Sequence, residues 1–180
     1  MDGVDMEGTL QGLGPEHLQP PGAPGTPRLE DPTIALDLAH YAEMLSQYAA
    51  VVERPYYEAQ DELSRLESLR QTTPELFRIS GMCLPRLDST CRQIARSEAM
   101  LGTAQIAAAL RLYRDAQNAY PASLDELRSV LPAPPVDPFT GKPFLYRREG
   151  SGFVVYSAGA GGANSGGVAG SDDILFRSPR

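Results

Sequence analysis

This sequence of 180 residues contains no long apolar run and few of the side chains on which catalysis usually depends. No stretch of about 18 consecutive apolar residues occurs, so no part of it is predicted to span a bilayer. Its two histidines are His17 and His40, and no Ser/His/Asp, Cys/His or HExxH arrangement surrounds them. Asp172 and Asp173 are adjacent and would point to opposite faces of a strand, so they make a poor acid and base pair. We therefore expect no enzymatic activity.

Cysteine is also scarce, with Cys83 and Cys91 as the only two. Their spacing fits neither a CxxC redox pair nor a zinc site, which would need more ligands. Two interpretations stay open. The first is a pair of buried or half-buried thiols, and the second is a disulfide that ties a loop to the helix after it. The disulfide would suit an oxidising compartment.

Positive charge is in the minority, and the net charge of the chain is −7. Nucleic-acid partners are not expected, because binding to phosphates needs a cationic face. Five acidic residues and one arginine lie among the first 30 residues. The start, MDGVDMEGTLQGLG, has neither the basic region nor the apolar region of a secretory signal peptide.

The composition divides the chain into three predicted parts. Residues 1–31 are rich in proline and glycine and lack an apolar period, which predicts a disordered tail or linker. Residues 32–82 form a predicted helical extension, and residues 83–180 a predicted α+β domain. A chain of 180 residues is long enough for one such domain with extensions.

The helical extension begins with a clear start signal. Asp31 is a suitable N-cap and Pro32 occupies the first helical position. Pro55 ends or kinks this helix, and a second helix is predicted up to about Arg70. One apolar stripe with spacings of four and three residues follows the first helix, and we expect it to be buried by ordinary helix packing. Its members are Ile34, Leu38, Tyr41, Leu45, Tyr48 and Val52.

Further helices are predicted beyond the hairpin. Thr73 and Pro74 repeat the cap-and-proline signal for a short helix that ends near Gly81. A long helix then runs from about residue 85 to about residue 119. One face of it is lined by small residues in the middle, and Gly102 should have a packing reason because glycine weakens a helix by about 1 kcal/mol. The residues of this face are Cys91, Ala95, Ala99, Gly102, Ile106, Leu110 and Tyr113.

The C-terminal part has the pattern of a small antiparallel sheet. Ser123 and Glu126 form a capping box for a short helix that ends near Leu131. Two alternating apolar segments, with Phe144 and Tyr146 in one and Phe153 and Val155 in the other, flank the glycine turn of residues 149–152. A third strand is predicted at residues 174–176. The expected fold class is therefore α+β, with a long helix packed on a small antiparallel sheet and preceded by a helical hairpin.

The glycine-rich segment of residues 159–171 has several possible uses. It can provide flexibility alone, or its carbonyl oxygens can surround a hard cation such as calcium together with nearby side-chain oxygens. Phosphate binding is disfavoured because acidic residues follow and no GKS/T motif is present. The side-chain candidates for a cation are Ser157, Asn164, Ser165, Ser171, Asp172 and Asp173.

Five short motifs in order give the C-terminal half a family resemblance. Residues 95–176 resemble the globular domain of the type II secretion major pseudopilin, a protein of the general secretion pathway protein G type. In that family a long helix ends in a Tyr-Pro element, and a capped helix, a proline-bounded turn, a hairpin and a glycine loop follow. The matching residues are Tyr120-Pro121, Asp137-Pro138-Phe139, Lys142-Pro143-Phe144-Leu145-Tyr146, Tyr156-Ser157-Ala158-Gly159-Ala160 and Asp173-Ile174.

The resemblance implies a long helix packed on a small antiparallel sheet and a structural subunit of a periplasmic filament without catalytic activity. It also implies calcium at the loop, held by Ser157, Asp172 and Asp173, with Asn164 as a further oxygen ligand. Gly161 stands where the family has an aspartate. The family's basic leader and hydrophobic first helix are not found in this sequence, and the extension of residues 32–80 is not explained by the family pattern. The chain is then either a soluble piece of a longer membrane protein or a domain used outside a filament.

Two roles follow as hypotheses. The first is a structural or assembly subunit that associates with copies of itself or with components of a secretion apparatus. The second is a protein-binding scaffold module whose extra helices supply the partner surface. The resemblance favours a periplasmic or other extracytoplasmic location, and the cytoplasm is the alternative because no signal peptide is visible.

Overall fold

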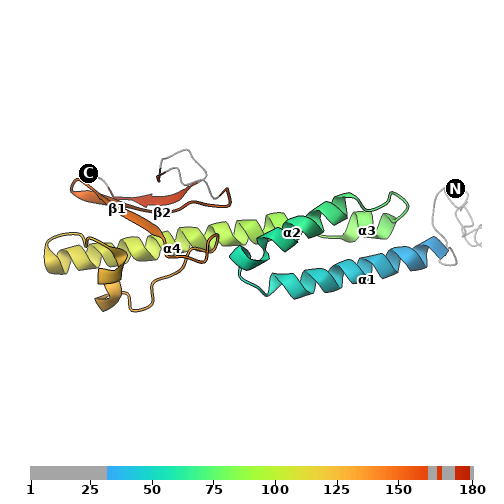
Figure 1. Cartoon of the computed structure of the whole chain (residues 1–180), viewed down its shortest axis with the longest axis horizontal. Helices are drawn as coiled ribbons and strands as arrows, with labels where there is room; N and C mark the ends of the chain where they lie inside the picture. Colours follow the sequence, from blue (N-terminus) through green and yellow to red (C-terminus); the bar gives the residue numbers. More distant parts are fainter. Residues whose placement is uncertain (1–31, 162–165, 168–172, 179–180) are drawn as a thin grey trace, which may run out of the picture.

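The computed structural model describes residues 32–161, 166–167 and 173–178, which form an elongated molecule (Figure 1). Its long axis follows one helix, α4 (Leu87–Gln117). A small sheet lies along the C-terminal half of α4, and helices α1 to α3 gather around its N-terminal half. The structure is therefore of the α+β class, with a long helix packed on a small antiparallel sheet.

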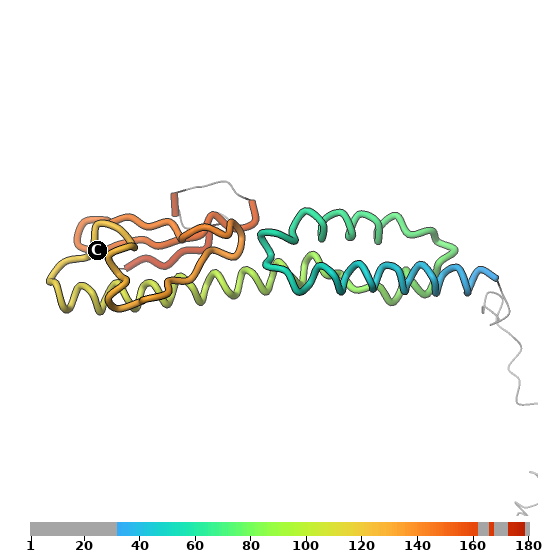
Figure 2. Tube along the Cα trace, turned by 60° about the horizontal axis from the view of Figure 1, so that its bottom comes forward, coloured from blue at the N-terminus to red at the C-terminus, as the bar shows by residue number. Residues whose placement is uncertain are grey.

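Helices α1 (Pro32–Val52) and α2 (Tyr56–Gln71) form the predicted hairpin, and Figure 2 shows them side by side. Pro55 separates them, as the sequence predicts, with extended dihedral angles of φ −53° and ψ 141°. Leu87 and Cys91 of α4 pack against the core between the helices, so α4 contributes to both halves of the molecule. That core consists of Met44, Tyr48, Val51, Ala59, Leu63, Leu66 and Leu84.

The apolar stripe predicted for α1 is not the side that the structure buries. Of the stripe, Tyr48 is buried, whereas Leu38, Leu45 and Val52 are 47%, 37% and 45% exposed. The prediction was wrong because α1 is apolar around much of its circumference, so spacing alone does not decide which side meets α2 and α3. The buried residues of α1 are Asp37, Met44, Tyr48 and Val51.

Asp37 explains this rotation of α1, because its buried carboxylate caps the short helix α3 (Arg78–Cys83). The carboxylate accepts hydrogen bonds from the backbone N–H groups of Ile79 (2.7 Å) and Ser80 (2.9 Å). The Ser80 hydroxyl donates a third hydrogen bond to the carboxylate, at 2.6 Å. The first N–H groups of a helix have no hydrogen-bond partner within the helix. A carboxylate at this end accepts their hydrogen bonds, and its negative charge interacts favourably with the helix dipole.

The start predicted for α3 at Thr73 and Pro74 is wrong. Residues 74–77 form a turn instead, closed by a hydrogen bond of 2.8 Å from the Phe77 N–H to the Pro74 carbonyl oxygen. The helix begins at Arg78. The Asp37 carboxylate on α1 caps the helix instead of the local signal at Thr73 and Pro74. A pattern of neighbouring residues could not predict this, because Asp37 is far away in sequence.

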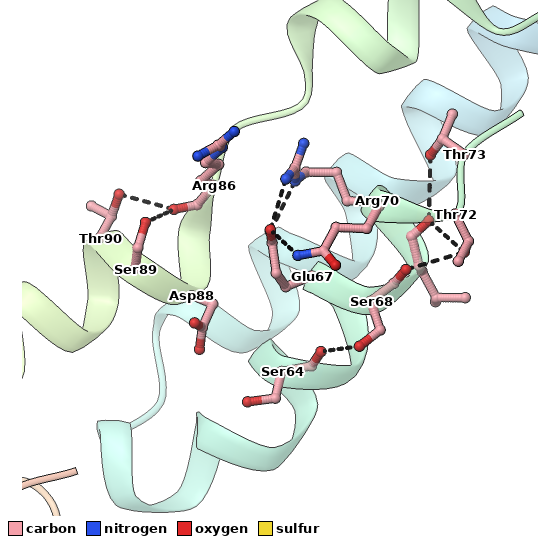
Figure 3. Close-up of polar contacts among 12 residues, drawn as sticks. Ser64, Glu67, Ser68, Arg70, Thr72, Thr73, Arg86, Asp88, Ser89 and Thr90 are labelled. Atoms are coloured by element: carbon pink, nitrogen blue, oxygen red, sulfur yellow. Dashed lines mark hydrogen bonds and ion pairs between the residues drawn. The ribbon is translucent and has the colours of Figure 1, made fainter. Parts of the chain in front are cut away.

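The last turns of α2 carry an ion pair between Glu67 and Arg70 (Figure 3). Two Arg70 nitrogens donate hydrogen bonds of 2.8 and 2.7 Å to the two carboxylate oxygens, and Gln71 donates a third of 3.0 Å. The hydrogen bonds from Arg70 outweigh the effect of burial. With help from Gln71 and from the positive charge of Arg86, they lower the pKa of Glu67 to about 2. The pair is therefore ionised at neutral pH.

The middle of α4 meets the sheet through small residues, as the sequence predicts. Gly102 has the expected packing reason, because a Cβ atom added there would lie 2.7 Å from the Phe144 ring. Cys91 and Tyr113, at the two ends of the predicted face, are half-buried. The buried members of that face are Ala95, Ala99, Gly102, Ile106 and Leu110.

The sheet contains β1 (Leu145–Glu149), β2 (Gly152–Ser157) and β3 (Ile174–Arg177), antiparallel in that order. The predicted hairpin and third strand are confirmed. Phe144 lies just before β1 rather than within it and is buried. Phe153, which is fully buried, belongs to the core between the sheet and α4.

The capping box of Ser123 and Glu126 is also present, although the short helix is a 3-10 helix, η2 (Leu124–Ser129). Glu126 accepts hydrogen bonds from the backbone N–H groups of Ala122 (2.8 Å) and Ser123 (3.2 Å). Tyr146 of β1 donates a hydrogen bond of 2.9 Å to the carbonyl oxygen of Pro121. These contacts attach the segment after α4 to the sheet.

Two predictions about the organisation of the chain stay predictions. The tail of residues 1–31 lies outside the described residues. The division at residues 82 and 83 is untested, and α4 packs in both cores. Among the described helices, none combines the length and the apolar character that crossing a membrane requires.

Candidate functional site

The structure brings together two of the four predicted calcium ligands. Ser157 ends β2 and pairs with Ile174 of β3, and Asp173 immediately precedes that strand. Both side chains are buried. Asn164 and Asp172 lie outside the described residues. The predicted site is therefore located at the sheet end from which the glycine-rich segment departs and to which it returns.

Both side chains bind backbone groups of that segment. The Ser157 hydroxyl oxygen accepts a hydrogen bond of 3.0 Å from the Gly159 N–H. The Asp173 carboxylate accepts one of 2.8 Å from the Gly167 N–H. Carboxylate and hydroxyl oxygens are ligands that calcium accepts, so their chemistry fits a calcium site. Within the described residues, however, no group of three or more His, Cys, Asp or Glu side chains is close enough to share a metal ion.

Two arginines of the sheet hold the same segment from the other side, and the sequence reasoning missed them. Arg147 of β1 donates a hydrogen bond of 2.6 Å to the carbonyl oxygen of Gly166, and Arg177 of β3 donates one of 2.9 Å to that of Gly167. Glu149 forms ion pairs with both arginines, at 2.6 and 3.3 Å. The available signal was the spacing of Arg147 and Glu149, because residues two apart share one face of a strand.

Gly166 and Gly167, held by Arg147 and Arg177, lie over the face of β2 that points away from α4. Val154 and Tyr156 are buried there although they do not belong to the core between the sheet and α4. A Cβ atom added to Gly167 would lie 3.0 Å from Tyr156 and 3.1 Å from Val154. Gly167 also has a positive φ of 66°. The glycine is required here because the backbone itself lies on the sheet.

The remaining reactive side chains do not gather at this site. His40 lies in the helical half, 3.4 Å from the Thr73 hydroxyl and with its ring 5.4 Å from that of Phe77. Both cysteines are free thiols, so the disulfide interpretation is wrong. The interpretation as buried or half-buried thiols holds for Cys91, which is half-buried, but not for Cys83, which is exposed. Burial and the Asp88 charge raise the pKa of Cys91.

A second candidate surface is an exposed apolar line along α4. Ile94, Leu101 and Leu112 are 54%, 65% and 60% exposed. Their spacings of seven and eleven residues return to nearly the same side of a helix with 3.6 residues per turn. The line therefore follows one side of α4 past both halves of the molecule.

A groove of about 420 Å³ opens beside this line where the two halves meet. Leu101 and Gly102 form its floor on α4. Tyr56 and Tyr57 at the start of α2 form one wall, and the proline-rich connector around Val136 forms another. Apolar grooves with aromatic walls are common sites for protein segments.

A larger cleft of about 590 Å³ lies between α2, α4 and the start of the glycine-rich segment. Its lining is polar and includes Asp61, Arg92 and Arg96. Arg92 is already held by an ion pair of 2.6 Å with Asp88. A hydrogen bond with the Tyr56 hydroxyl, together with the Asp88 carboxylate, raises the pKa of Arg92. The contact between Tyr56 of α2 and Arg92 of α4 therefore lies at this cleft.

No family model, no curated protein and no solved structure matches this chain.

Proposed function

We propose that this chain is a non-catalytic structural or assembly subunit similar to the type II secretion major pseudopilin. The observation that carries the proposal is the exposed apolar line on α4, formed by Ile94, Leu101 and Leu112 on a helix that packs its other side on a small sheet. Large apolar side chains aligned on one exposed side of a helix are typical of a surface that another protein covers. Protein partners, with copies of the same chain among them, follow from this role.

The family resemblance adds the setting. By that resemblance we propose that the subunit acts outside the cytoplasm, as the globular part of a secretion or surface apparatus. The order of its C-terminal elements supports the proposal, because a long helix, a short capped helix, a hairpin and a third strand follow one another.

A second candidate function is a protein-binding scaffold module. The apolar groove beside Tyr56, Tyr57 and Val136 favours it, because this groove exists only where the helical hairpin meets the α+β half. Such a module would bind one partner segment in the groove and would not form larger assemblies of its own.

Leu101→Lys tests the assembly role. We expect the light-scattering mass of the wild-type chain in size-exclusion chromatography to increase with loading concentration. Leu101→Lys should need an at least tenfold higher concentration to reach the same mass. A buried lysine in a protein contact would have to lose its hydration.

Met100→Lys is the matched control, because Met100 is 56% exposed on the same helix but points about 100° away from Leu101. It should behave like the wild type. Equal masses for Leu101→Lys and the wild type at every concentration would contradict the assembly role of the α4 line.

Calcium at the glycine-rich segment stays a prediction of the same resemblance, with Ser157 and Asp173 as the described residues that would hold the ion. Calcium at 100 times its dissociation constant should stabilise the fold by about 2.7 kcal/mol relative to a chelated sample. Thermal unfolding with calcium, with magnesium and with chelator measures this difference. An identical melting temperature in all three samples, up to millimolar calcium, would contradict the site.

A further inference from the structure

The outer side of α1 is an uninterrupted apolar seam that nothing in the described residues covers. Its members follow each other at spacings of three and four residues, and every one of them is exposed. The seam extends over 18 residues, from Ala35 to Val52, which corresponds to about 26 Å of helix. It consists of Ala35, Leu38, Ala42, Leu45, Ala49 and Val52.

This seam lies beside the packed side of α1 rather than within it. Met44 and Val51 on the packed side are nearly fully buried against α2, whereas Leu45 and Val52, one residue later, are 37% and 45% exposed. A helix that is apolar on most of its circumference is normally covered on more than one side. The structure covers one side of α1 and leaves the seam for another partner.

The order of residues in the seam suits a second copy of itself. Alanine and a larger residue alternate along it at the heptad spacing of a coiled coil. When two such seams are placed antiparallel around a two-fold axis between residues 43 and 44, Ala42 of one chain faces Leu45 of the other. In the same register Leu38 faces Ala49, and Ala35 faces Val52. Every layer then joins one small and one large side chain, as close helix packing requires.

The absence of charged residues from the seam favours the same partner. The chain carries a net charge of −7, so two copies repel each other in general. The six seam positions contain no charged residue, which makes this side a place where two copies can approach. A membrane surface fits less well, because helices that lie on membranes are rich in Lys and Arg. Helix α1 contains neither residue, and Arg54 lies two residues after its C-terminal end.

The size of the seam sets the strength of the contact. One helix pair about 26 Å long and about 10 Å wide buries less than the roughly 1,200 Å² that stable interfaces need. The expected association is therefore weak, reversible and dependent on concentration. Such strength suits a subunit that gains further contacts when it assembles.

We propose that a second copy of this chain docks on the α1 seam, antiparallel and around a two-fold axis. The proposal deepens the proposed function, on which it rests, because it names a copy of the chain as the first partner and α1 as the surface. It also gives the helical extension a role, since the family pattern does not account for these helices.

Disulfide trapping tests the register directly. In a background without Cys83 and Cys91, Ala42→Cys and Leu45→Cys chains are prepared separately and then mixed under mild oxidation. We expect the mixture to form covalent dimers at least tenfold faster than either chain alone, because residue 42 faces residue 45 and neither faces itself. Faster dimer formation by Ala42→Cys alone would indicate a parallel pair and overturn the proposal.

Leu45→Lys provides the second measurement, in the chain with its native cysteines. Leu45 is partly exposed, so the fold should tolerate lysine, whereas the dimerisation constant should weaken at least tenfold in sedimentation velocity. Ala50→Lys is the matched control and should leave dimerisation unchanged, because Ala50 is exposed and points about 100° away from its seam neighbour Ala49.

The outcomes separate this proposal from the proposed function. A wild-type chain that assembles through the Leu101 line but is unaffected by Leu45→Lys overturns the α1 dimer and leaves the assembly role intact. A monomer at all concentrations that binds vesicles, or binds a different protein through Leu45, also overturns the docking of a second copy. A dimer that Leu45→Lys dissociates supports it when the same dimer persists in Leu101→Lys, which should remove only the larger assemblies that form through the α4 line.

Discussion

Asp37→Ala is expected to lower the free energy of unfolding by at least about 3 kcal/mol. Three hydrogen bonds to a charged group are lost, each of which contributes about 1.5–3 kcal/mol, and the removal of a carboxylate from a buried site offsets only part of this loss. The buried carboxylate accepts hydrogen bonds from the Ile79 N–H, the Ser80 N–H and the Ser80 hydroxyl. Without it these donors stay buried without a partner, and α3 loses its attachment to α1. Urea unfolding followed by circular dichroism measures the change.

Asp61→Ala is the control for this substitution, since Asp61 is exposed on α2 and should change stability by less than about 0.5 kcal/mol. Equal effects of the two substitutions would contradict the capping role of Asp37.

The same carboxylate gives the fold a dependence on pH. Burial alone would raise the pKa of Asp37, but the hydrogen bonds from Ser80 and Ile79 and the charge of His40 outweigh it and lower the pKa below its ordinary value of 3.8. The stability that Asp37 contributes is therefore complete above the unfolded pKa and is lost as the pH falls through the lower folded pKa. The difference in stability between the wild type and Asp37→Asn should shrink in strong acid.

Gly102→Val is expected to destabilise the fold by about 3 kcal/mol, the upper end of the cost of adding atoms to a packed core. The first atom of the new side chain would lie 2.7 and 2.8 Å from two carbons of the Phe144 ring, which is itself buried. The gain in helix propensity on replacing glycine is at most about 1 kcal/mol and does not compensate. Thermal and urea unfolding measure the loss.

Gly81→Ala is the matched control, because Gly81 lies in α3 and an added Cβ atom meets nothing within 4 Å. It should stabilise the chain by up to about 1 kcal/mol. If Gly102→Val were as stable as the wild type, α4 would not pack on the sheet through Gly102 and Phe144.

Much of the fold follows from local sequence signals. Four local features were predicted correctly. They are the break at Pro55, the capping box of Ser123 and Glu126, the small face of α4 around Gly102 and the hairpin around Gly150. Each depends on residues close in sequence, so one stretch of chain contains the information. The prediction of α4 as a helix had further support from its length, because a periodicity of about 3.6 residues that persists over many turns fits no other element.

Contacts between distant residues were not predictable in this way. The capping of α3 by Asp37 joins segments more than 40 residues apart, and it determines both where α3 begins and which side of α1 is buried. The apolar stripe of α1 was expected to be buried by helix packing, but the side of Met44, Tyr48 and Val51 is buried instead. Residues such as Leu38 and Leu45 show the period of a packed helix and are nevertheless exposed in a single chain.

The candidate site was partly predictable. Ser157 and Asp173 were selected from a motif and do lie together at one end of the sheet. The arginines that bind the segment between them, Arg147 and Arg177, were missed because each acts through a backbone carbonyl oxygen that has no sequence signal of its own.

We propose that this chain associates with copies of itself through exposed apolar helix surfaces. Sedimentation equilibrium of the wild-type chain, from about 5 to 500 μM, covers the range in which a weak interface forms. We expect the weight-average mass to rise from that of the 19.4 kDa chain towards or beyond twice this value. A mass that stays at that of one chain over the whole range would contradict this self-association.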